Sequence, residues 1–133
     1  MVDGPTEATD HERTEANRGT VRSFVEEVLV KGGLDKLGHY VDGEGFTQHN
    51  PHIADGLAAW RSVLETRAIN YERNHRLLAE GNFVLAVSEG YLDGVHSSFY
   101  DLFRAAEGML VEHWDTIEAV PARDEWKNDN GKF

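Results

Sequence analysis

The sequence contains no cysteine, has no long apolar run and carries few basic side chains. Without cysteine the chain cannot form a disulfide scaffold, an iron–sulfur cluster or a thiolate zinc site, and this composition fits a reducing compartment. Its 24 acidic residues outnumber its 13 basic residues, which gives a formal net charge of −11. Because such a charge repels phosphate groups and no basic patch offsets it, we expect no nucleic-acid partner.

No stretch of the sequence approaches the roughly 20 apolar residues that a transmembrane helix needs. Residues 1–13 are polar and lack the apolar core of a signal peptide, so we expect a cytoplasmic protein that does not bind membranes. They also lack periodicity, which predicts a disordered or loosely attached tail. The remaining residues, 14–133, match the length of a single domain that can bury a core.

The chain divides into a helical part and a part rich in strands. Apolar residues at steps of three and four predict an amphipathic helix over 14–31, which a pair of glycines ends. A shorter helix is predicted over 34–41 and a short strand over 46–49. A third helix is predicted over 55–67, with Asp55 as its cap.

Beyond residue 69, runs rich in β-branched and aromatic residues alternate with glycine-containing turns. These runs predict four antiparallel strands at 71–78, 83–89, 96–104 and 109–119. Helices followed by a meander of strands are typical of an α+β domain, with the helices on one face of a curved antiparallel sheet.

The last predicted hairpin gathers acidic, imidazole and aromatic side chains. If Gly108 takes the left-handed position of a three-residue loop, Asp101 lies opposite His113. An apolar lining around a few converging polar groups is typical of a ligand pocket. Strand alternation then places six side chains on one face of the sheet: Phe99, Asp101, Phe103, Val111, His113 and Asp115.

Two alternatives stay open for this hairpin. A two-residue turn would place Asp101 opposite Trp114, although the residues of each strand would keep their shared face. An aspartate and a histidine on neighbouring strands also form ordinary surface contacts.

Three further residues are candidates for the same pocket. His49 lies where an extended segment meets a proline turn, beside Gln48 and Asn50, and fits a pocket role and a structural role equally well. His75 shares its predicted strand face with mixed side chains, so a structural or surface role competes with substrate binding. Trp60, on the apolar face of the third predicted helix, is a candidate substrate-binding residue.

The spacing of the histidines shows no local metal motif such as HExxH. A metal site would need His49, His75 and His113, or a carboxylate, to meet through the fold. We therefore expect neither a metal nor another cofactor, and a metal enzyme remains an alternative.

Four segments, taken together, resemble a known family. They are FTQHNP at 46–51, AEGNF at 79–83, FYDLFR at 99–104 and VEHWD at 111–115. In order and spacing they are similar to the SnoaL-like polyketide cyclases of the nuclear transport factor 2-like superfamily, from about residue 15 to the C-terminus. The resemblance implies an α+β cone, in which a curved antiparallel sheet wraps around N-terminal helices and encloses a pocket, commonly in a homodimer.

For the cyclases of this family, the resemblance implies a cofactor-free intramolecular aldol condensation with Asp115 as the acid/base group. A carboxyl group among aromatic residues has a raised pKa, which suits a general base. His113 or His49 would stabilise the enolate, and Asp101 would orient His113 or hold the second proton. The cyclases have a histidine fourteen residues before the acid/base aspartate, where this chain has Asp101. The expected activity is therefore that of a lyase or isomerase acting on a small, polyketide-like carbonyl compound, and a non-catalytic binding or dimerising module is the alternative.

Overall fold

Most helical elements precede the four long strands along the chain, as the sequence predicts. The computed structural model describes residues 2–133. Its helical elements are η1 (His11–Arg13), α1 (Thr14–Phe24), η2 (Val25–Val30), η3 (Leu34–Lys36), α2 (Leu37–Tyr40), α3 (Leu57–Glu65) and η4 (Arg123–Glu125). Its strands are β1 (Thr47–Gln48), β2 (Ile69–Glu80), β3 (Phe83–Leu92), β4 (Val95–Ala106) and β5 (Met109–Ala119). Within the described residues no helix has the length and apolarity that crossing a membrane would require.

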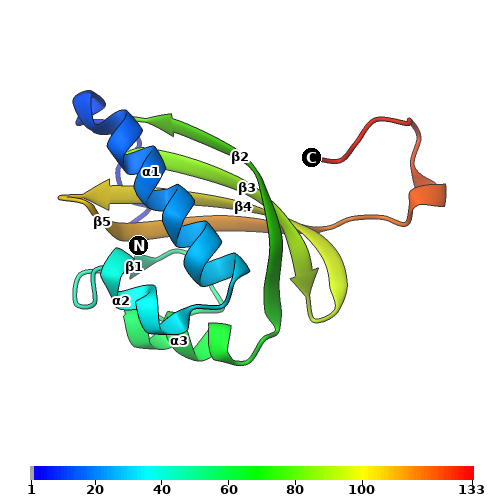
Figure 1. Cartoon of the computed structure of the whole chain (residues 1–133), viewed down its shortest axis with the longest axis horizontal. Coiled ribbons are helices and arrows are strands. Elements are labelled where there is room, and N and C mark those ends of the chain that lie inside the picture. The colour runs from blue at the N-terminus through cyan, green and yellow to red at the C-terminus, as the bar shows by residue number, and fades with distance from the viewer. Residues whose placement is uncertain (1) are drawn as a thin grey trace.

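The first predicted helix is confirmed, and its second half is wound as a π-helix. α1 and η2 follow one another without a break and run across the sheet (Figure 1). Gly32 lies just beyond them with a φ of +74°, a left-handed conformation that glycine adopts without a steric penalty. The apolar stripe of this helix is almost fully buried and comprises Val21, Phe24, Val25 and Val28.

The third predicted helix exists, but the prediction of its cap is wrong. α3 begins after Gly56, and no side chain caps its N-terminus. The Asp55 carboxylate instead accepts a hydrogen bond from the backbone N–H of Gln48, at 2.8 Å. Asp55 therefore ties the loop before α3 to β1, while Trp60 and Leu64 of α3 enter the core.

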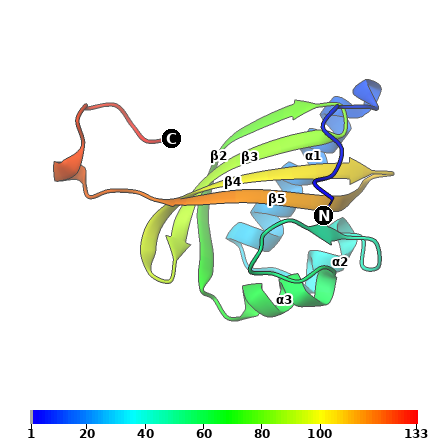
Figure 2. The same cartoon turned by 180° about the vertical axis from the view of Figure 1, so that it is seen from behind.

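The sheet has the strand order β1-β5-β4-β3-β2, with β1 parallel to β5 and all other neighbours antiparallel. The helices cover one face, which we call the inner face, and leave the outer face free of helices (Figures 1 and 2). The core lies between the helices and the inner face. Its largest contributions from the sheet are Phe99, Phe103 and Leu110. This arrangement confirms the α+β class and the curved sheet around N-terminal helices.

The predicted register of the last hairpin is wrong by two residues. Glu107 and Gly108 both have positive φ, at 52° and 80°, so the turn has two residues and pairs Ala106 with Met109. A bulge then leaves Val111 between the pairs Arg104–Glu112 and Ala105–Leu110. Leu110, rather than Val111, is fully buried in the core.

Because the shift is two residues, the face of each functional side chain survives. Asp101 lies opposite Asp115 instead of His113, and Phe103 lies opposite His113. Phe99 pairs with Ile117. The predicted inner-face group is therefore present, without Val111.

The segment before the helices, predicted as a loose tail, runs along the outer face. The Trp114 indole donates a hydrogen bond to the Asp3 carbonyl at 3.1 Å. Thr9 and Asn82 exchange two further bonds, from the Asn82 N–H to the Thr9 carbonyl at 2.8 Å and from the Thr9 N–H to the Asn82 side chain at 2.9 Å. These contacts place the segment against the outer face, and its loose attachment stays a prediction.

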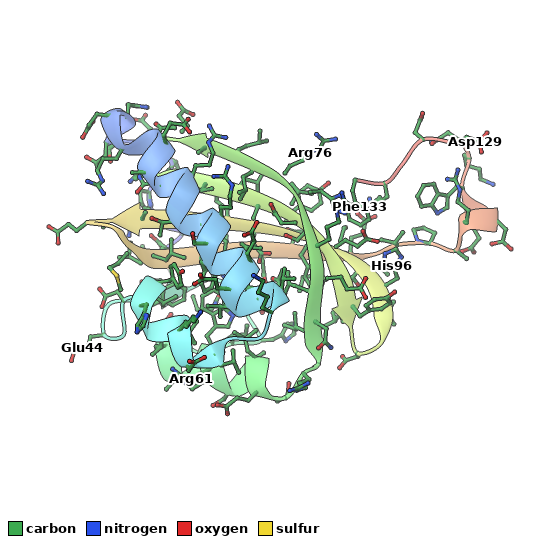
Figure 3. The ribbon with its side chains drawn as sticks, viewed as in Figure 1. Glu44, Arg61, Arg76, His96, Asp129 and Phe133 are labelled. Atoms are coloured by element: carbon green, nitrogen blue, oxygen red, sulfur yellow. The ribbon has the colours of Figure 1, made fainter. Side chains whose placement is uncertain are left out.

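The C-terminal segment also returns to the outer face. Phe133 stacks on His75 with ring centroids 4.6 Å apart and lies beside His96 (Figure 3). Both imidazoles bind the Glu89 carboxylate, at 2.9 and 2.6 Å. Between the two terminal segments, Leu78 remains exposed on the outer face. The homodimer that the resemblance implies stays a prediction.

Candidate functional site

Two short polar segments, residues 48–50 and 112–115, face each other across the β1–β5 pair. The register places Gln48 beside His113. Side chains alternate between the two faces of the sheet, so each segment sends some groups inward and some outward. Three side-chain contacts join the segments: Gln48 to His113 at 2.9 Å, His49 to Glu112 at 2.7 Å, and Asn50 to Asp115 at 2.8 Å.

On the inner face, Asp101 and His113 form a buried pair. Asp101 Oδ1 lies 2.8 Å from His113 Nε2, and the two residues are 1% and 2% exposed. The Tyr71 hydroxyl group donates to Asp101 Oδ2 at 2.9 Å. The Asp101 carboxyl group thus has partners on both oxygen atoms, as a buried charge requires.

The protonation of His113 follows from its neighbours. The backbone N–H of Asn50 can only donate, and it meets Gln48 Oε1 at 3.0 Å, which identifies that atom as the carbonyl oxygen. His113 Nδ1 faces the same oxygen and therefore carries a proton. His113 Nε2 and Asp101 Oδ1 both have lone pairs, so a contact at 2.8 Å needs a second proton between them. Hydrogen bonds at both ring nitrogens therefore fix the orientation of the imidazole.

Aromatic rings enclose this pair. Trp60 and Phe103 both stack on the His113 ring, each with ring centroids 4.9 Å away. Phe99 packs on Tyr71 at 4.5 Å, beside Asp101. The aromatic residues that were predicted to bind substrate therefore surround the acidic and imidazole groups, and Trp60, Phe99 and Phe103 are themselves buried.

Asp115 is the more accessible carboxyl group of the site. Burial raises the pKa of Asp115, and the charge of Asp101 adds to this effect. The hydrogen bond from Asn50 and the charge of His113 act in the opposite direction but do not cancel the shift. A half-buried carboxyl group with a raised pKa can accept a proton from a substrate and return it.

Tyr71 keeps its proton. Burial raises its pKa well above 10.0, and the charge of Asp101, its hydrogen-bond acceptor, raises it further. Tyr71 therefore acts as a hydrogen-bond donor and not as a base.

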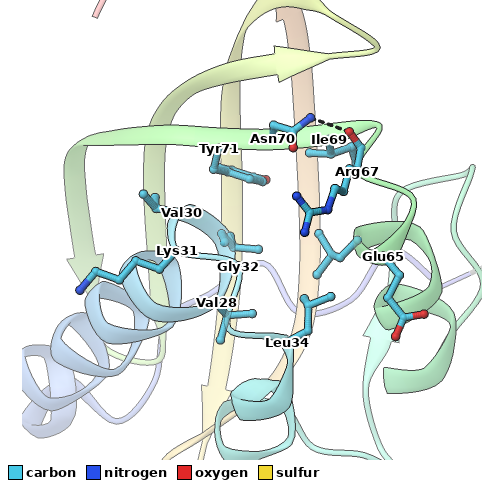
Figure 4. Close-up of a pocket in the computed structure, with 12 residues that line it drawn as sticks. Val28, Val30, Lys31, Gly32, Leu34, Glu65, Arg67, Ile69, Asn70 and Tyr71 are labelled. Carbon is cyan, nitrogen blue, oxygen red and sulfur yellow. Dashed lines mark hydrogen bonds between the residues drawn. The ribbon is translucent and has the colours of Figure 1, made fainter.

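A cavity of about 350 Å³ opens between the end of η2, the end of α3 and the beginning of β2 (Figure 4). Tyr71 lines it, and the Arg67 guanidinium group points into it. Asp101, His113 and Asp115 do not line the cavity. Tyr71 thus connects the cavity to the acid–base cluster, because its ring lines the cavity and its hydroxyl group bonds to Asp101.

The structure brings together three of the four predicted catalytic residues, Asp101, His113 and Asp115. His49 lies on the outer face, where it binds Glu112 and stacks on Trp114. The predicted substrate-binding residue His75 also lies on the outer face, bound to Glu89. In both cases the placement follows from strand geometry, since their acidic partners are outward-facing residues of β5 and β3.

The sequence did not single out Tyr71, Gln48 or Asn50 as functional residues. Gln48 and Asn50 stood out only as polar neighbours of His49, and the parallel pairing of β1 with β5 that assigns their partners is a long-range feature. Tyr71 reaches Asp101 because β2 is shifted in register next to it, between Tyr71 and Arg73. Gly90 lets β2 lie close to β3 at this point, since a Cβ on Gly90 would lie 2.0 Å from the Asn70 carbonyl oxygen.

Asp101, His113 and Asp115 could also hold a metal ion, because one ligating atom of each lies within 4.8 Å of the others. Their chemistry fits such a site only in part. Both nitrogen atoms of His113 already have partners, and a metal on Nε2 would replace the proton that joins His113 to Asp101.

Neither a family model nor a curated protein sequence matches the chain. Solved structures resemble it. A candidate ketosteroid isomerase from Kribbella flavida superimposes with a TM-score of 0.71 at 15% identity, over 90% of this chain and 94% of that one. An NTF2-like protein of unknown function from Cytophaga hutchinsonii gives 0.67 at 18% identity, over 86% and 95%. A candidate SnoaL-like polyketide cyclase from Jannaschia gives 0.60 at 17% identity, over 86% and 92%. The chain therefore has the nuclear transport factor 2-like fold, the fold of the SnoaL-like cyclases that its sequence motifs resemble.

Proposed function

We propose that the protein is a cofactor-free lyase or isomerase that moves protons on a small carbonyl compound, by aldol-type condensation or by enolisation. The observation that carries this proposal is the placement of Asp115. Its carboxyl group is half-buried, has a raised pKa and is held by Asn50 next to the proton-bearing Asp101–His113 pair. Two acidic groups in different environments are what an acid–base reaction at neutral pH needs.

In the proposed reaction, Asp115 removes a proton from the carbon next to the substrate carbonyl group. The electrons move onto the carbonyl oxygen, and the resulting enolate needs a hydrogen-bond donor. Tyr71 lines the cavity and stays protonated, and it would fill this role by turning its hydroxyl group from Asp101 to the substrate oxygen. In a condensation, the enolate carbon attacks a second carbonyl group, and the alkoxide that forms takes the proton from Asp115. In an isomerisation, the enolate takes that proton at a different carbon. In both cases Asp115 returns to its ionised form.

The test uses β-dicarbonyl compounds, whose central protons are acidic enough to exchange readily. Purified protein is mixed with such a compound in deuterium oxide, and loss of the proton signal is followed by NMR. We expect the wild-type protein to accelerate the exchange and Asp115→Asn to abolish the acceleration. Asp124→Asn, which changes an exposed carboxylate, is the control. Exchange that Asp115→Asn leaves unchanged would remove Asp115 from the mechanism.

A second function, a binding module without catalysis, is favoured by one observation. Asp101 and His113 are almost inaccessible and do not line the cavity, whose wall residue Tyr71 bonds to Asp101. If β-dicarbonyl and aromatic polyketide-like compounds raise the melting temperature of the protein but undergo no exchange, the binding module is the better description.

A further inference from the structure

The outer face carries a second cluster directly behind the acid–base site. Glu112 is 3% exposed, and both of its carboxylate oxygens are occupied. His49 Nε2 contacts Oε1 at 2.7 Å, and Arg104 Nε donates to Oε2 at 2.6 Å. The His49 ring lies flat on the Trp114 indole, with centroids 4.6 Å apart and an angle of 6° between the planes. This cluster of His49, Arg104, Glu112 and Trp114 is called the outer clamp below.

The outer clamp is tied to the site by the chain itself. His49 lies between Gln48 and Asn50, whose side chains reach His113 and Asp115 on the inner face. Glu112 and Trp114 likewise flank His113 in the sequence. Because the three residues are consecutive, we expect a backbone displacement at His49 to move Asn50, the donor of Asp115, and Gln48, the acceptor of His113.

Side-chain contacts carry much of the attachment of β1 to β5. The strand has two residues, and the backbone hydrogen bond that follows it joins the His49 N–H to the His113 carbonyl at 2.9 Å. So short a parallel pairing leaves the register weakly determined by the backbone alone. The outer clamp contributes a charge-assisted bond and a stacked ring pair at this point, and such bonds are stronger than neutral ones.

We propose that His49 is a positioning residue, which acts through the outer clamp to hold Gln48 and Asn50 in register with His113 and Asp115. This inference deepens the proposed function and rests on it. The N-terminal segment completes the arrangement, because Gly4 lies so close to Glu112 and Trp114 that a Cβ there would approach the Glu112 carboxylate to 2.5 Å.

The chain contains a matched control for this proposal. His75 also lies on the outer face. It binds Glu89 at 2.9 Å and stacks on the Phe133 ring with centroids 4.6 Å apart. Its side chain is 18% exposed, against 16% for His49. No residue next to His75 contacts Asp115 or His113, so the two histidines differ in their connection to the site.

The experiment compares His49→Phe, which keeps the stacked ring but loses the bond to Glu112, with His49→Gln, which keeps a donor, and with His75→Phe. The side-chain amide signals of Asn50 are recorded by ¹H–¹⁵N NMR, and the exchange reaction is separated into kcat and KM. We expect His49→Phe to shift the Asn50 signals and to lower kcat by about tenfold or more with little change in KM, because small misplacements of a catalytic group are costly. His49→Gln should keep the Asn50 signals and kcat close to their wild-type values, and His75→Phe should change neither the signals nor kcat.

Two results would overturn the proposal. In the first, the Asn50 signals respond to His49→Phe no more than to His75→Phe. In the second, His49→Gln lowers kcat as much as His49→Phe does. If His49→Phe does not fold, Glu112→Gln carries the same comparison from the other side of the bond. The NMR measurement does not depend on turnover, so it separates a failure of this proposal from a failure of the proposed function.

Discussion

Asp101 and Asp115 lie directly opposite each other on β4 and β5, so two carboxyl groups share the inner face. Their surroundings differ. Asp101 is fully buried and bound by Tyr71 and His113, whereas Asp115 is half-buried and bound by Asn50. Burial raises the pKa of Asp115, and the neighbouring charge adds to this. In the proposed reaction, Asp115 therefore exchanges the proton and Asp101 orients His113.

The raised pKa of Asp115 predicts a pH dependence of stability. The folded state binds this proton more tightly than the unfolded chain, whose aspartates titrate at about 3.9. The resulting stabilisation is complete below that value and is lost as the pH rises through the folded pKa. Asp115→Asn cannot ionise, so we expect it to be at least as stable as the wild type at neutral pH. Urea unfolding between about pH 4 and pH 8 measures this, and a variant that loses stability relative to the wild type as the pH rises would contradict it.

Asp101→Asn should destabilise the protein strongly. The substitution removes the carboxylate that both Tyr71 and His113 contact inside the core. Removing one partner of a buried ion pair costs about 3 kcal/mol or more. Unfolding in urea would show this loss, with Asp115→Asn as the comparison. A cost similar to that of an exposed substitution would mean that the Asp101–His113 pair contributes no stability.

Tyr71→Phe tests the link between the cavity and the acid–base cluster. It removes the hydroxyl group that donates to Asp101 and leaves a buried acceptor with one partner fewer, at a cost of about 1–3 kcal/mol. If Tyr71 also supplies the donor for the enolate, kcat of the exchange reaction falls as well. Tyr91→Phe, on the outer side of β3, is the control. Unchanged kcat in Tyr71→Phe would assign the donor role to another group.

Removal of metal ions should leave the proposed reaction unchanged. The Asp101–His113 contact is filled by a proton, and both His113 nitrogens are occupied by protein atoms. Protein dialysed against EDTA is therefore expected to catalyse exchange at the same rate as untreated protein. Loss of activity on dialysis, with recovery on adding zinc or manganese, would instead support the metal site that the three inner-face residues could form.

The sequence was sufficient for the helices and strands and for the shared face of Asp101, His113 and Asp115, because strand alternation is a local property. It could not place His49. Its side-chain direction depends on which strand β1 pairs with, and β1 joins β5 in parallel across more than sixty residues of chain.

The hairpin register failed for a related reason. Two features each shift the pairing by one residue: the turn at Glu107 and Gly108, and the bulge at Val111. Together they shift it by two residues, so Asp101 and Asp115 stay on a common face. Bulges leave little trace in a single sequence, since the extra residue looks like any other strand residue.

The facing segments 48–50 and 112–115 have a consequence for how this site can change. In each segment, side chains that reach the inner face alternate with side chains of the outer clamp. Each segment supplies the hydrogen-bond partners of the other. Substitutions in one should therefore be accompanied in related sequences by compensating substitutions in the other, and a graft of this site onto another scaffold would have to transfer both together.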